Sequence, residues 1–494
     1  MAELALDTTC LDDYRRFLAI KQLPTYTMRG HLATFPDEYA GQLGLTKGRR
    51  KHREWEPNPD LWDYQRDIAR IAIRKRKYAV FADCGLGKTL ILLEFAKAAA
   101  KRTGRKVLIV SPLMVVTQTL AEAFRFYPDM DIEQVQAAGL PEWLGRPGKG
   151  IAITNYEAVK GDLPTSSLGG LVLDESSMLK SHYGKWGTRL ISLGRGVPYK
   201  LCCTGTPAPN DRIEYANHAV FLDSFSTVNA FLATYFINRG QTQERWALKP
   251  HALRPFYRAL SHWCVFLTDP ATYGWTDNCD TIPPMNIHMH YVDMTDEQKR
   301  LVSGITGQLF TTDLGGITTR ASLGQIAKGH MKGRDIATNK PAYIQDLIAS
   351  WPDESTLVWC LYNEEQSRLA AILPGSASIT GSTPHAERMR ILDDFKSGHL
   401  KTLISKPKIL GFGLNLQIAT RQVFSGLQDS YEQFYQAVKR SNRYGSTRPL
   451  NVHIPVTDIE EPMVQNVMRK AKQVDADTTE QERLFRESGH GGLG

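Results

Sequence analysis

A glycine-rich segment at residues 81–89 sets the architecture of the first part of the chain. It reads Phe-Ala-Asp-Cys-Gly-Leu-Gly-Lys-Thr, between an apolar run at 78–81 that predicts a buried strand and one at 90–97 that predicts a helix. Glycines let backbone N–H groups curl around an anion, and a helix N-terminus adds its dipole. This order predicts a phosphate-binding loop, the alternative being an ordinary tight turn before a helix.

Two side chains at the end of this segment supply the chemistry that such a loop needs. Lys88 is placed to reach the outer phosphates of a nucleoside triphosphate, and the Thr89 hydroxyl is placed to hold Mg²⁺. Ala82 stands where the strict pattern has its first glycine. The residues of this segment that we expect to contact the nucleotide are Asp83, Gly85, Leu86, Gly87, Lys88 and Thr89.

The size and charge of the chain limit its class. Its 494 residues are too many for one hydrophobic core and predict two or three domains. Hydrophobic residues make up 42% and charged residues 23%, as in ordinary globular proteins. The net charge of +8 allows either a polyanionic partner or a basic surface that binds nothing.

Cysteine usage and the N-terminus indicate a compartment. The seven cysteines show no CxxC spacing, which predicts a reduced, intracellular chain without a zinc site or a disulfide framework. The first residues are acidic and lack the apolar core of a signal peptide, and no stretch has the apolar length of a membrane span. We therefore expect a cytoplasmic protein with no membrane partner.

Short apolar runs alternate with helical patterns in two separate parts of the chain. Continuous apolar strands alternating with helices predict parallel sheets covered by helices on both faces. The fold class is therefore α/β, with two parallel-sheet lobes in tandem. The runs lie at 78–81, 107–110, 151–154, 171–173 and 201–203 in the first lobe, and at 357–360, 378–380, 402–405, 423–425 and 452–456 in the second.

The region between these two parts, 225–335, loses the alternation and mixes aromatic with basic residues. We interpret it as a largely helical bridge or insertion. A basic cluster at 47–53 closes the N-terminal extension and fits a solvated linker as well as a phosphate-backbone contact. The predicted domains are an N-terminal extension, 1–54; a first ATP-binding lobe, 55–224; the bridge, 225–335; a second lobe, 336–460; and a C-terminal helix with a flexible tail, 461–494.

An acidic pair follows one of the predicted strands of the first lobe. Asp174 and Glu175 come directly after the run 171–173, at the strand end where α/β sheets place ligands. Asp174 is expected to hold Mg²⁺, and Glu175 to orient and deprotonate the attacking water. Thr204 and Thr206 end the next strand, and their hydroxyls are expected to sense the γ-phosphate through this pair. A solvated surface pair and a polar turn are the alternatives.

Two arginines in the second lobe complete the predicted catalytic set. Arg440 and Arg443 are three residues apart, which places them on one face if the segment is helical. Guanidinium groups from the second lobe can reach a γ-phosphate bound to the first, stabilise transition-state charge and make lobe closure depend on ATP. A basic helix face without this role is the alternative.

These segments occur together in a fixed order, and the chain resembles superfamily 2 helicases, in particular the Swi/Snf-type double-stranded DNA translocases. The resemblance covers about residues 55–465. Segments 65–68 and 112–118 also resemble compact helicases carried by bacteriophages and mobile elements. The segments that carry the resemblance are 62–65, 83–89, 110–113, 153–157, 174–177, 204–210, 411–416 and 436–445.

The resemblance implies two RecA-like lobes and further site residues. Gln65 matches the glutamine that reads adenine, so that the nucleotide is ATP, and Trp62 or Tyr64 is its stacking neighbour. Gly413 matches a second-lobe residue at the nucleotide, and Gln436 joins Thr204 and Thr206 in coupling. The residues that match nucleic-acid contacts are Ser111, Pro112, Thr154, Asn155, Ser405 and Asn415. Such contacts go to the phosphate backbone, without reading sequence.

Two departures from the family pattern concern the interface between the lobes. Ser176 and Ser177 stand where relatives carry a small residue and the histidine that couples the acidic pair to the second lobe. Ser446 replaces the glutamine after the glycine of the arginine segment. The implied function is an ATP-dependent helicase or translocase that moves along mainly double-stranded DNA. An RNA-dependent ATPase and an ATP-switched nucleic-acid-binding module without turnover remain alternatives.

Overall fold

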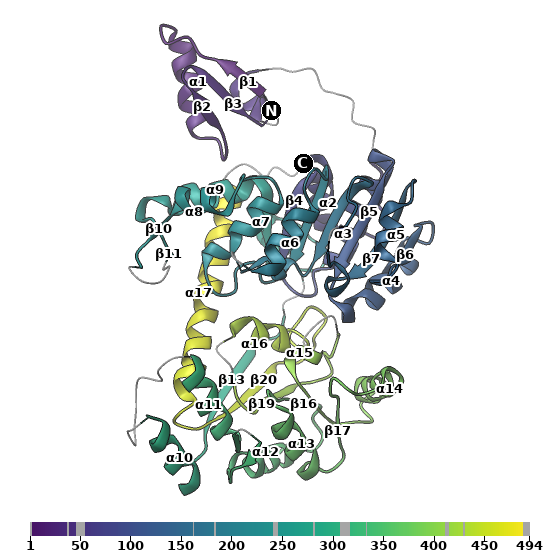
Figure 1. The fold of residues 1–494 in the computed structure, drawn as a ribbon, viewed down its shortest axis with the longest axis vertical. Helices are drawn as coiled ribbons and strands as arrows, with labels where there is room; N and C mark the ends of the chain where they lie inside the picture. Colours follow the sequence, from purple (N-terminus) through teal and green to yellow (C-terminus); the bar gives the residue numbers. More distant parts are fainter. Residues whose placement is uncertain are drawn as a thin grey trace.

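The computed structural model describes residues 2–36, 39–45, 55–161, 163–181, 184–240, 246–279, 282–306, 317–331, 333–410, 414–427 and 430–487. These residues form a small N-terminal unit, two α/β lobes stacked one on the other, and a long C-terminal helix that runs along both lobes (Figure 1). The basic cluster at 47–53, the glycine segment at 411–413 and the predicted tail at 488–494 lie outside the described residues.

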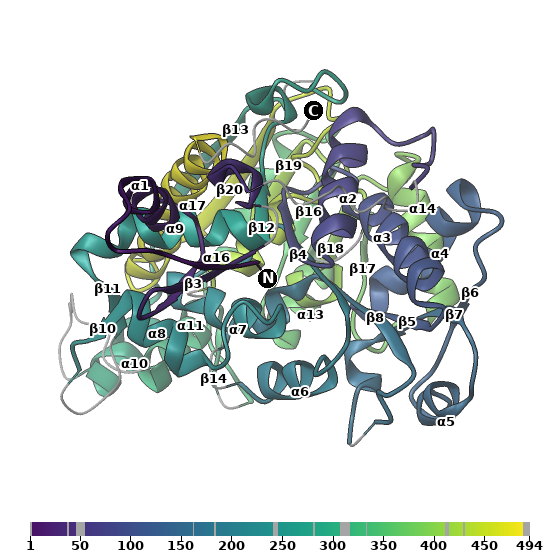
Figure 2. The same ribbon diagram turned by 90° about the horizontal axis from the view of Figure 1, so that it is seen from above.

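The N-terminal unit is an antiparallel sheet with one helix. The sheet order is β1-β3-β2, and α1 packs beside it around buried Ile20 and Phe35. The unit contacts α9 of the first lobe, where the Tyr39 hydroxyl lies 2.7 Å from His262 Nδ1, and it sits over that side of the lobe (Figure 2). The elements are β1 (Ala2–Ala5), α1 (Leu11–Lys21), β2 (Thr27–Arg29) and β3 (Leu32–Phe35).

The first lobe is built on a parallel sheet, as predicted. Its neighbouring strands all pair in parallel, and strands β4, β5, β8 and β9 are buried along their length because helices cover both faces. In spatial order the strands are β12 (Cys264–Leu267), β4 (Lys77–Ala82), β9 (Tyr199–Thr204), β8 (Leu168–Asp174), β5 (Lys106–Ser111), β7 (Gly150–Asn155) and β6 (Ile132–Gln134).

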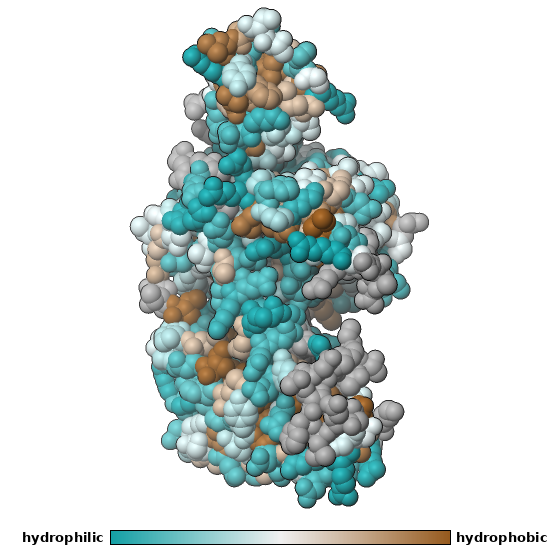
Figure 3. Space-filling view, turned by 90° about the vertical axis from the view of Figure 1, so that its left-hand side faces the viewer, coloured by the Kyte–Doolittle hydropathy of each residue, from teal (hydrophilic) through white to brown (hydrophobic). Residues whose placement is uncertain are grey.

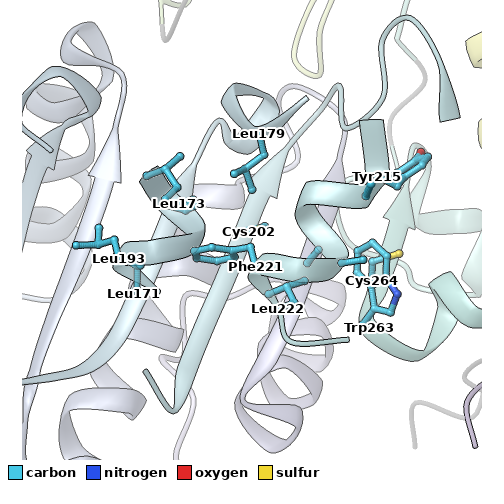
Figure 4. Close-up of a cluster of buried hydrophobic side chains, with 14 of the residues drawn as sticks. Leu171, Leu173, Leu179, Leu193, Cys202, Tyr215, Phe221, Leu222, Trp263 and Cys264 are labelled. Atoms are coloured by element: carbon cyan, nitrogen blue, oxygen red, sulfur yellow. The ribbon is translucent and has the colours of Figure 1, made fainter. Parts of the chain in front are cut away.

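Alternate residues of these strands face two separate hydrophobic cores. Leu171 and Leu173 of β8 point to the same core as Cys202 of β9, where Phe221 and Leu222 cover them (Figure 4). The opposite face packs against α2 (Asp63–Lys75), α3 (Lys88–Thr103) and α4 (Leu113–Phe126). The helices of the first face are α5 (Leu140–Gly145), α6 (Lys185–Leu193), α7 (Tyr215–Phe221), α8 (Val228–Tyr235) and α9 (Leu253–Trp263).

The second lobe is also a parallel α/β sheet. One face packs against α12 and α13, and the other against α14, α15, α16 and the start of α17. In spatial order its strands are β13 (Met285–Tyr291), β20 (Leu450–Val456), β19 (Arg421–Phe424), β16 (Thr356–Trp359), β18 (Thr402–Ser405) and β17 (Ser376–Ser378). Its helices are α12 (Lys340–Ala349), α13 (Asn363–Ile372), α14 (His385–Lys396), α15 (Pro407–Leu410) and α16 (Tyr431–Val438).

The region 225–335, interpreted from sequence as a bridge, contributes a strand to each large sheet. β12 is the edge strand beside β4, with Val265 opposite Val80. β13 is the edge strand beside β20, with Ile287 opposite Val452. The apolar run of β12 lies among aromatic residues, which hid it in the sequence. In β13 apolar and polar residues alternate, and most of its side chains are exposed, so it lacks the continuous apolar run of a buried strand.

The rest of this region supplies small additions to the two lobes. A hairpin of β10 (Phe236–Asn238) and β11 (Trp246–Leu248) extends the first lobe beside α8. On the second lobe, α10 (Asp296–Thr306), α11 (Ile317–Ala327) and the hairpin of β14 (His330–Met331) and β15 (Arg334–Asp335) surround a satellite core that includes Leu323.

Helix α17 (Glu461–Phe485) is anchored in both lobes. Val464 and Val467 are buried in the core of the second lobe. At its other end, Glu482 accepts hydrogen bonds from the backbone and hydroxyl groups of Thr268, both at 2.7 Å. A cavity of about 390 Å³ lies between the lobes and is closed on one side by this helix.

The surface on the side where α17 runs is mainly hydrophilic, with hydrophobic residues in separate patches among the described residues (Figure 3). Within the described part of the chain, no helix combines the length and apolarity needed to cross a membrane.

Candidate active site between the two lobes

The phosphate loop adopts the backbone that its glycines permit. Gly85 and Gly87 have φ angles of +93° and +62°, and α3 begins directly after them at Lys88. A Cβ atom at Gly87 would lie 2.1 Å from Gln65 Nε2, so no side chain fits there without displacing Gln65. The N–H groups at the start of α3, directly after this turn, are oriented for an anion.

The Lys88 ammonium group is bound to the loop itself. Its Nζ donates to the carbonyl oxygens of Ala82 at 2.8 Å and of Asp83 at 3.1 Å. A bound phosphate oxygen would replace these carbonyl acceptors, because an ionised acceptor makes the stronger hydrogen bond.

Gln65 lies against the phosphate loop, and its reading of adenine stays a prediction. Its Oε1 accepts from Trp62 N at 3.0 Å, and its Nε2 donates to the carbonyls of Leu86 and Gly87 at 3.4 Å. Tyr64 is fully buried and donates its hydroxyl to Leu86 O, whereas Trp62 is 37% exposed. Of the two proposed stacking neighbours, only Trp62 is accessible to a base.

The acidic pair lies at the C-terminal end of β8. The Ser111 hydroxyl donates to Asp174 Oδ2 at 2.9 Å, and the Thr204 hydroxyl donates to Glu175 Oε2 at 3.1 Å. Thr206 N donates in turn to the Thr204 hydroxyl at 3.1 Å. Glu175 has a φ angle of +50°, a left-handed backbone that costs a non-glycine residue about 1 kcal/mol. Of the two threonine hydroxyls predicted to contact the acidic pair, that of Thr204 does so, whereas that of Thr206 is buried without a hydrogen-bond partner.

The surroundings of Asp174 fit a bound cation. Burial and the charge of Glu175 together raise the pKa of Asp174 to about 7, while the hydrogen bond from Ser111 and the charge of Lys88 act in the opposite direction. Two neighbouring carboxylates without a full counter-charge supply oxygen donors of the kind that Mg²⁺ prefers. That Thr89 and Asp174 hold Mg²⁺ stays a prediction.

The second lobe places Arg440 at the phosphate loop. Arg440 Nη2 lies 4.0 Å from Cys84 Sγ, and its Nε donates to Gln436 O at 2.9 Å. Burial lowers the pKa of Arg443, which lies within electrostatic reach of Cys84 and Asp83. Helix α16 ends at Val438, so the two arginines stand on the turns after the helix and not on a helical face as the sequence suggested. Their position beside the loop is unaffected.

Two ion pairs across the lobe interface were not predicted. Asp83 accepts from Lys439 Nζ at 2.8 Å and also from the Tyr435 hydroxyl, so its carboxylate faces the second lobe. Lys180, which follows the acidic pair by five residues, pairs with Glu432 of α16. The sequence signal for these pairs was the seven-residue spacing of Glu432 and Lys439. This spacing places opposite charges two helical turns apart on one side of a helix.

The residue after the acidic pair bonds within its own lobe. The Ser176 hydroxyl lies 3.1 Å from His218 Nε2 of α7, and burial lowers the pKa of His218 to about 4. The acidic segment thus contacts a histidine of α7, and this contact lies inside the first lobe.

The proposed nucleic-acid residues divide by exposure. Ser111, Thr154 and Ser405 are buried, and the hydroxyls of Ser111 and Ser405 donate to Asp174 and to Ile379 O, so they support neighbouring segments rather than reach a ligand. The remaining three keep accessible surface and stay candidates for backbone contact; they are Pro112, Asn155 and Asn415. Gly413 lies outside the described residues.

A cross-lobe contact on the same side was also missed by the sequence. Arg388 of α14 in the second lobe donates from Nη1 to Met114 Sδ at 3.4 Å, next to Pro112 at the start of α4. In the sequence, the segment of Arg388 follows a hydroxyl-rich loop that ends in Thr383 and Pro384. This was the available signal for the contact.

Comparisons with protein families identify the chain. A profile of the SNF2-related domain matches residues 73–340, more than half of the sequence, and a profile of the helicase conserved C-terminal domain matches residues 339–445. The chain belongs to the SNF2-related family. The resemblance to Swi/Snf-type superfamily 2 proteins and the α/β fold of two parallel-sheet lobes are confirmed; a phage origin stays a prediction.

Two mouse relatives resemble the SNF2-related chain over most of its length. "DNA annealing helicase and endonuclease ZRANB3" is 22% identical over 80% of the chain and 38% of its own length. "SWI/SNF-related matrix-associated actin-dependent regulator of chromatin subfamily A member 1" is 23% identical over 82% of the chain and 41% of its own length. The chain thus spans about two fifths of these relatives.

A solved structure, "Sulfolobus solfataricus SWI2/SNF2 ATPase core in complex with dsDNA", is 18% identical, with a TM-score of 0.41 over 88% of the chain and 99% of that structure.

Proposed function

We propose that the chain is an ATP-driven DNA translocase that moves along mainly double-stranded DNA. The observation that carries this proposal is the position of Arg440, whose Nη2 lies 4.0 Å from Cys84 in the phosphate loop of the other lobe. An ATPase site divided between two lobes links the hydrolysis of ATP to their relative movement.

Each residue of the first lobe has a defined part in hydrolysis. Lys88 exchanges its two carbonyl acceptors for phosphate oxygens. Glu175, oriented by Thr204, positions the attacking water and accepts its proton. Thr89 and Asp174 would hold Mg²⁺, which neutralises phosphate charge when bound.

The contact of the second lobe then depends on whether the γ-phosphate is present. Arg440 donates to the charge that develops on the γ-phosphate, a contribution worth roughly 10³ to 10⁵ in rate for such arginines. When phosphate leaves, this attraction is lost and the interface between the lobes weakens. Repeated closing and opening moves the exposed contacts near Pro112 and Asn415 along a phosphate backbone.

The choice of DNA rests on the relatives and on charge. One mouse relative is named as a DNA annealing helicase, and the net charge of +8 favours a polyanionic partner. Duplex binding without base readout predicts an affinity that falls steeply with salt.

A steady-state ATPase assay with duplex DNA, single-stranded DNA and RNA tests this proposal. Duplex DNA is expected to stimulate hydrolysis most, and Lys88→Ala and Glu175→Gln are expected to abolish the stimulated rate. Lys101→Ala, on the exposed side of the same helix α3, is the matched control and should keep it. Greater stimulation by RNA, or turnover that survives both substitutions, would refute the assignment.

A second assay separates movement from unwinding. A triplex-forming strand on duplex DNA is expected to be displaced in an ATP-dependent reaction, because a motor that tracks the duplex pushes it off. A forked duplex without a third strand reports strand separation. Unwinding without triplex displacement contradicts duplex tracking.

A further inference from the structure

The face of α16 that meets the first lobe carries two opposite charges. Glu432 and Lys439 are seven residues apart, and Gln436 lies between them on the same side. Lys439 is the residue that caps the C-terminal end of the helix. Both charged side chains are largely buried, with 8% and 14% of their surfaces exposed.

Each charge pairs with a different half of the ATPase site. Glu432 pairs with Lys180, which ends the short 3₁₀ helix that begins directly after Glu175. Lys439 pairs with Asp83, which opens the phosphate loop, at 2.8 Å. One helix thus touches the segment of the acidic pair and the phosphate loop at the same time.

The charges on the two lobes match in only one orientation of α16. The first lobe presents a base at Lys180 and an acid at Asp83, and α16 presents an acid and then a base. Reversing the helix on this surface would put like charges opposite each other, which is unfavourable because the side chains of Glu432, Lys439 and Asp83 are largely buried. The two pairs therefore fix the register of α16 on the first lobe.

The register of α16 determines where Arg440 lies. Arg440 directly follows Lys439, and its Nε donates back to Gln436 O, so its guanidinium group is held against the end of the helix. Gln436 Nε2 lies 3.5 Å from Glu432 Oε1, which connects the first ion pair to the same segment. A shift of α16 would therefore move Arg440 away from the phosphate loop.

We infer that the Lys180–Glu432 and Asp83–Lys439 ion pairs form an interlobe clasp that positions Arg440 for hydrolysis. Lys180 and Glu432 are positioning residues that contact no nucleotide. This clasp accounts for the departure at Ser176 and Ser177: Ser176 bonds to His218 inside the first lobe, and Lys180 makes the contact to the second lobe. The inference rests on the proposed function, because it assigns Arg440 a role in ATP hydrolysis.

Charge reversal tests the clasp. Lys180→Glu and Glu432→Lys are each expected to lower kcat for ATP with saturating duplex DNA by about 10-fold or more, because the reversed charge faces a like charge. The KM for ATP is expected to stay within about twofold, since neither side chain contacts the nucleotide. The double variant restores opposite charges and is expected to recover most of kcat.

A matched control and a second measurement complete the design. Glu142→Lys reverses a charge in an exposed pair with Arg146 and should leave kcat unchanged. Small-angle X-ray scattering reports lobe docking even without hydrolysis: each single reversal is expected to expand the particle and the double variant to return it to wild-type size.

The outcomes separate the clasp from the proposed function. Single reversals that change neither kcat nor the scattering curve overturn the clasp, as does a double variant that recovers neither. A wild-type protein without DNA-stimulated ATPase activity refutes the proposed function, while expansion and recovery in scattering still support the interlobe contact.

Discussion

Arg440 Nη2 lies 4.0 Å from Cys84 Sγ, although the two residues are 356 positions apart and belong to different lobes. A charged group of the second lobe thus stands at the phosphate loop of the first, held there by a hydrogen bond from its Nε to Gln436 O. This relationship makes the ATPase site sensitive to the distance between the lobes.

Replacing Arg440 tests whether its geometry matters as well as its charge. Arg440→Ala is expected to lower kcat for ATP by roughly 10³-fold. Arg440→Lys keeps a positive charge but loses the planar guanidinium fork, so we expect it to recover little of the loss. Stopped-flow and steady-state ATPase assays with duplex DNA measure both. Arg146→Ala, on an exposed turn, is the control, and a fully active Arg440→Lys would show that charge alone suffices.

Two glycines with nearly equal φ angles distinguish backbone strain from crowding at the nucleotide site. Gly87 and Gly104 have φ angles of +62° and +64°, but only a Cβ at Gly87 meets a neighbour, Gln65. Alanine at either position is expected to cost about 1 kcal/mol of stability, because both backbones are left-handed. Only Gly87→Ala is expected to abolish binding of a fluorescent ATP analogue. Equal loss of binding in Gly104→Ala would assign the effect to strain alone.

A buried charge triad predicts a large stability effect in the second lobe. Glu460 accepts from Lys328 and from Lys340, both at 2.6 Å, and these lysines hold the pKa of Glu460 at about 2 against the effect of burial. Glu460→Gln removes the carboxylate that pairs with both buried lysines, so we expect a loss of about 3–5 kcal/mol in urea unfolding.

The control for this triad is Glu297→Gln, which breaks an exposed pair with Arg334 in the same lobe. That change is expected to cost less than about 1 kcal/mol. Similar losses for the two substitutions would contradict a special role of the buried triad.

His218 predicts how stability depends on pH. Burial lowers its pKa from 6.5 to about 4, so between these values the unfolded chain binds a proton that the folded chain does not. The free energy of unfolding therefore falls as pH decreases through this window, by up to about 1.4 kcal/mol per pH unit from this group. Below pH 4 the folded histidine is also protonated and its contribution levels off.

Urea unfolding of His218→Gln between pH 7 and pH 4 measures this contribution. The variant is expected to lose less stability over the window than the wild type, whatever its stability at pH 7. His399→Gln, which changes an exposed histidine, should keep the wild-type slope. An unchanged slope in His218→Gln would mean that other groups, such as buried His453, dominate the dependence.

The sequence predicted the elements that a local pattern encodes. The parallel strand β8 contains the apolar run 171–173, and two glycines before a lysine mark the phosphate loop. Asp174 and Glu175 could be placed because parallel strand ends share one edge of a sheet. The strands, the phosphate loop and the acidic pair depend on residues that are close in sequence, so the sequence alone predicts them.

The elements that were missed depend on distant partners. β13 becomes a strand through its pairing with β20, about 165 residues later, and its alternating residues resemble a loop when read alone. Ser111 was expected to touch nucleic acid, but its burial beside Asp174 follows from the pairing of β5 with β8. The pair of Lys180 and Glu432 spans 252 positions, and neither residue stands out locally.

Helix α17 has a mechanical consequence. The chain passes between the lobes once between β12 and β13, and α17 passes back from the second lobe to the first. Two bodies joined at one point can swivel about any axis, whereas two joined at separate points can rotate only about the line through both joints. While both ends of α17 stay docked, the lobes therefore have one principal degree of freedom and open and close along the same path.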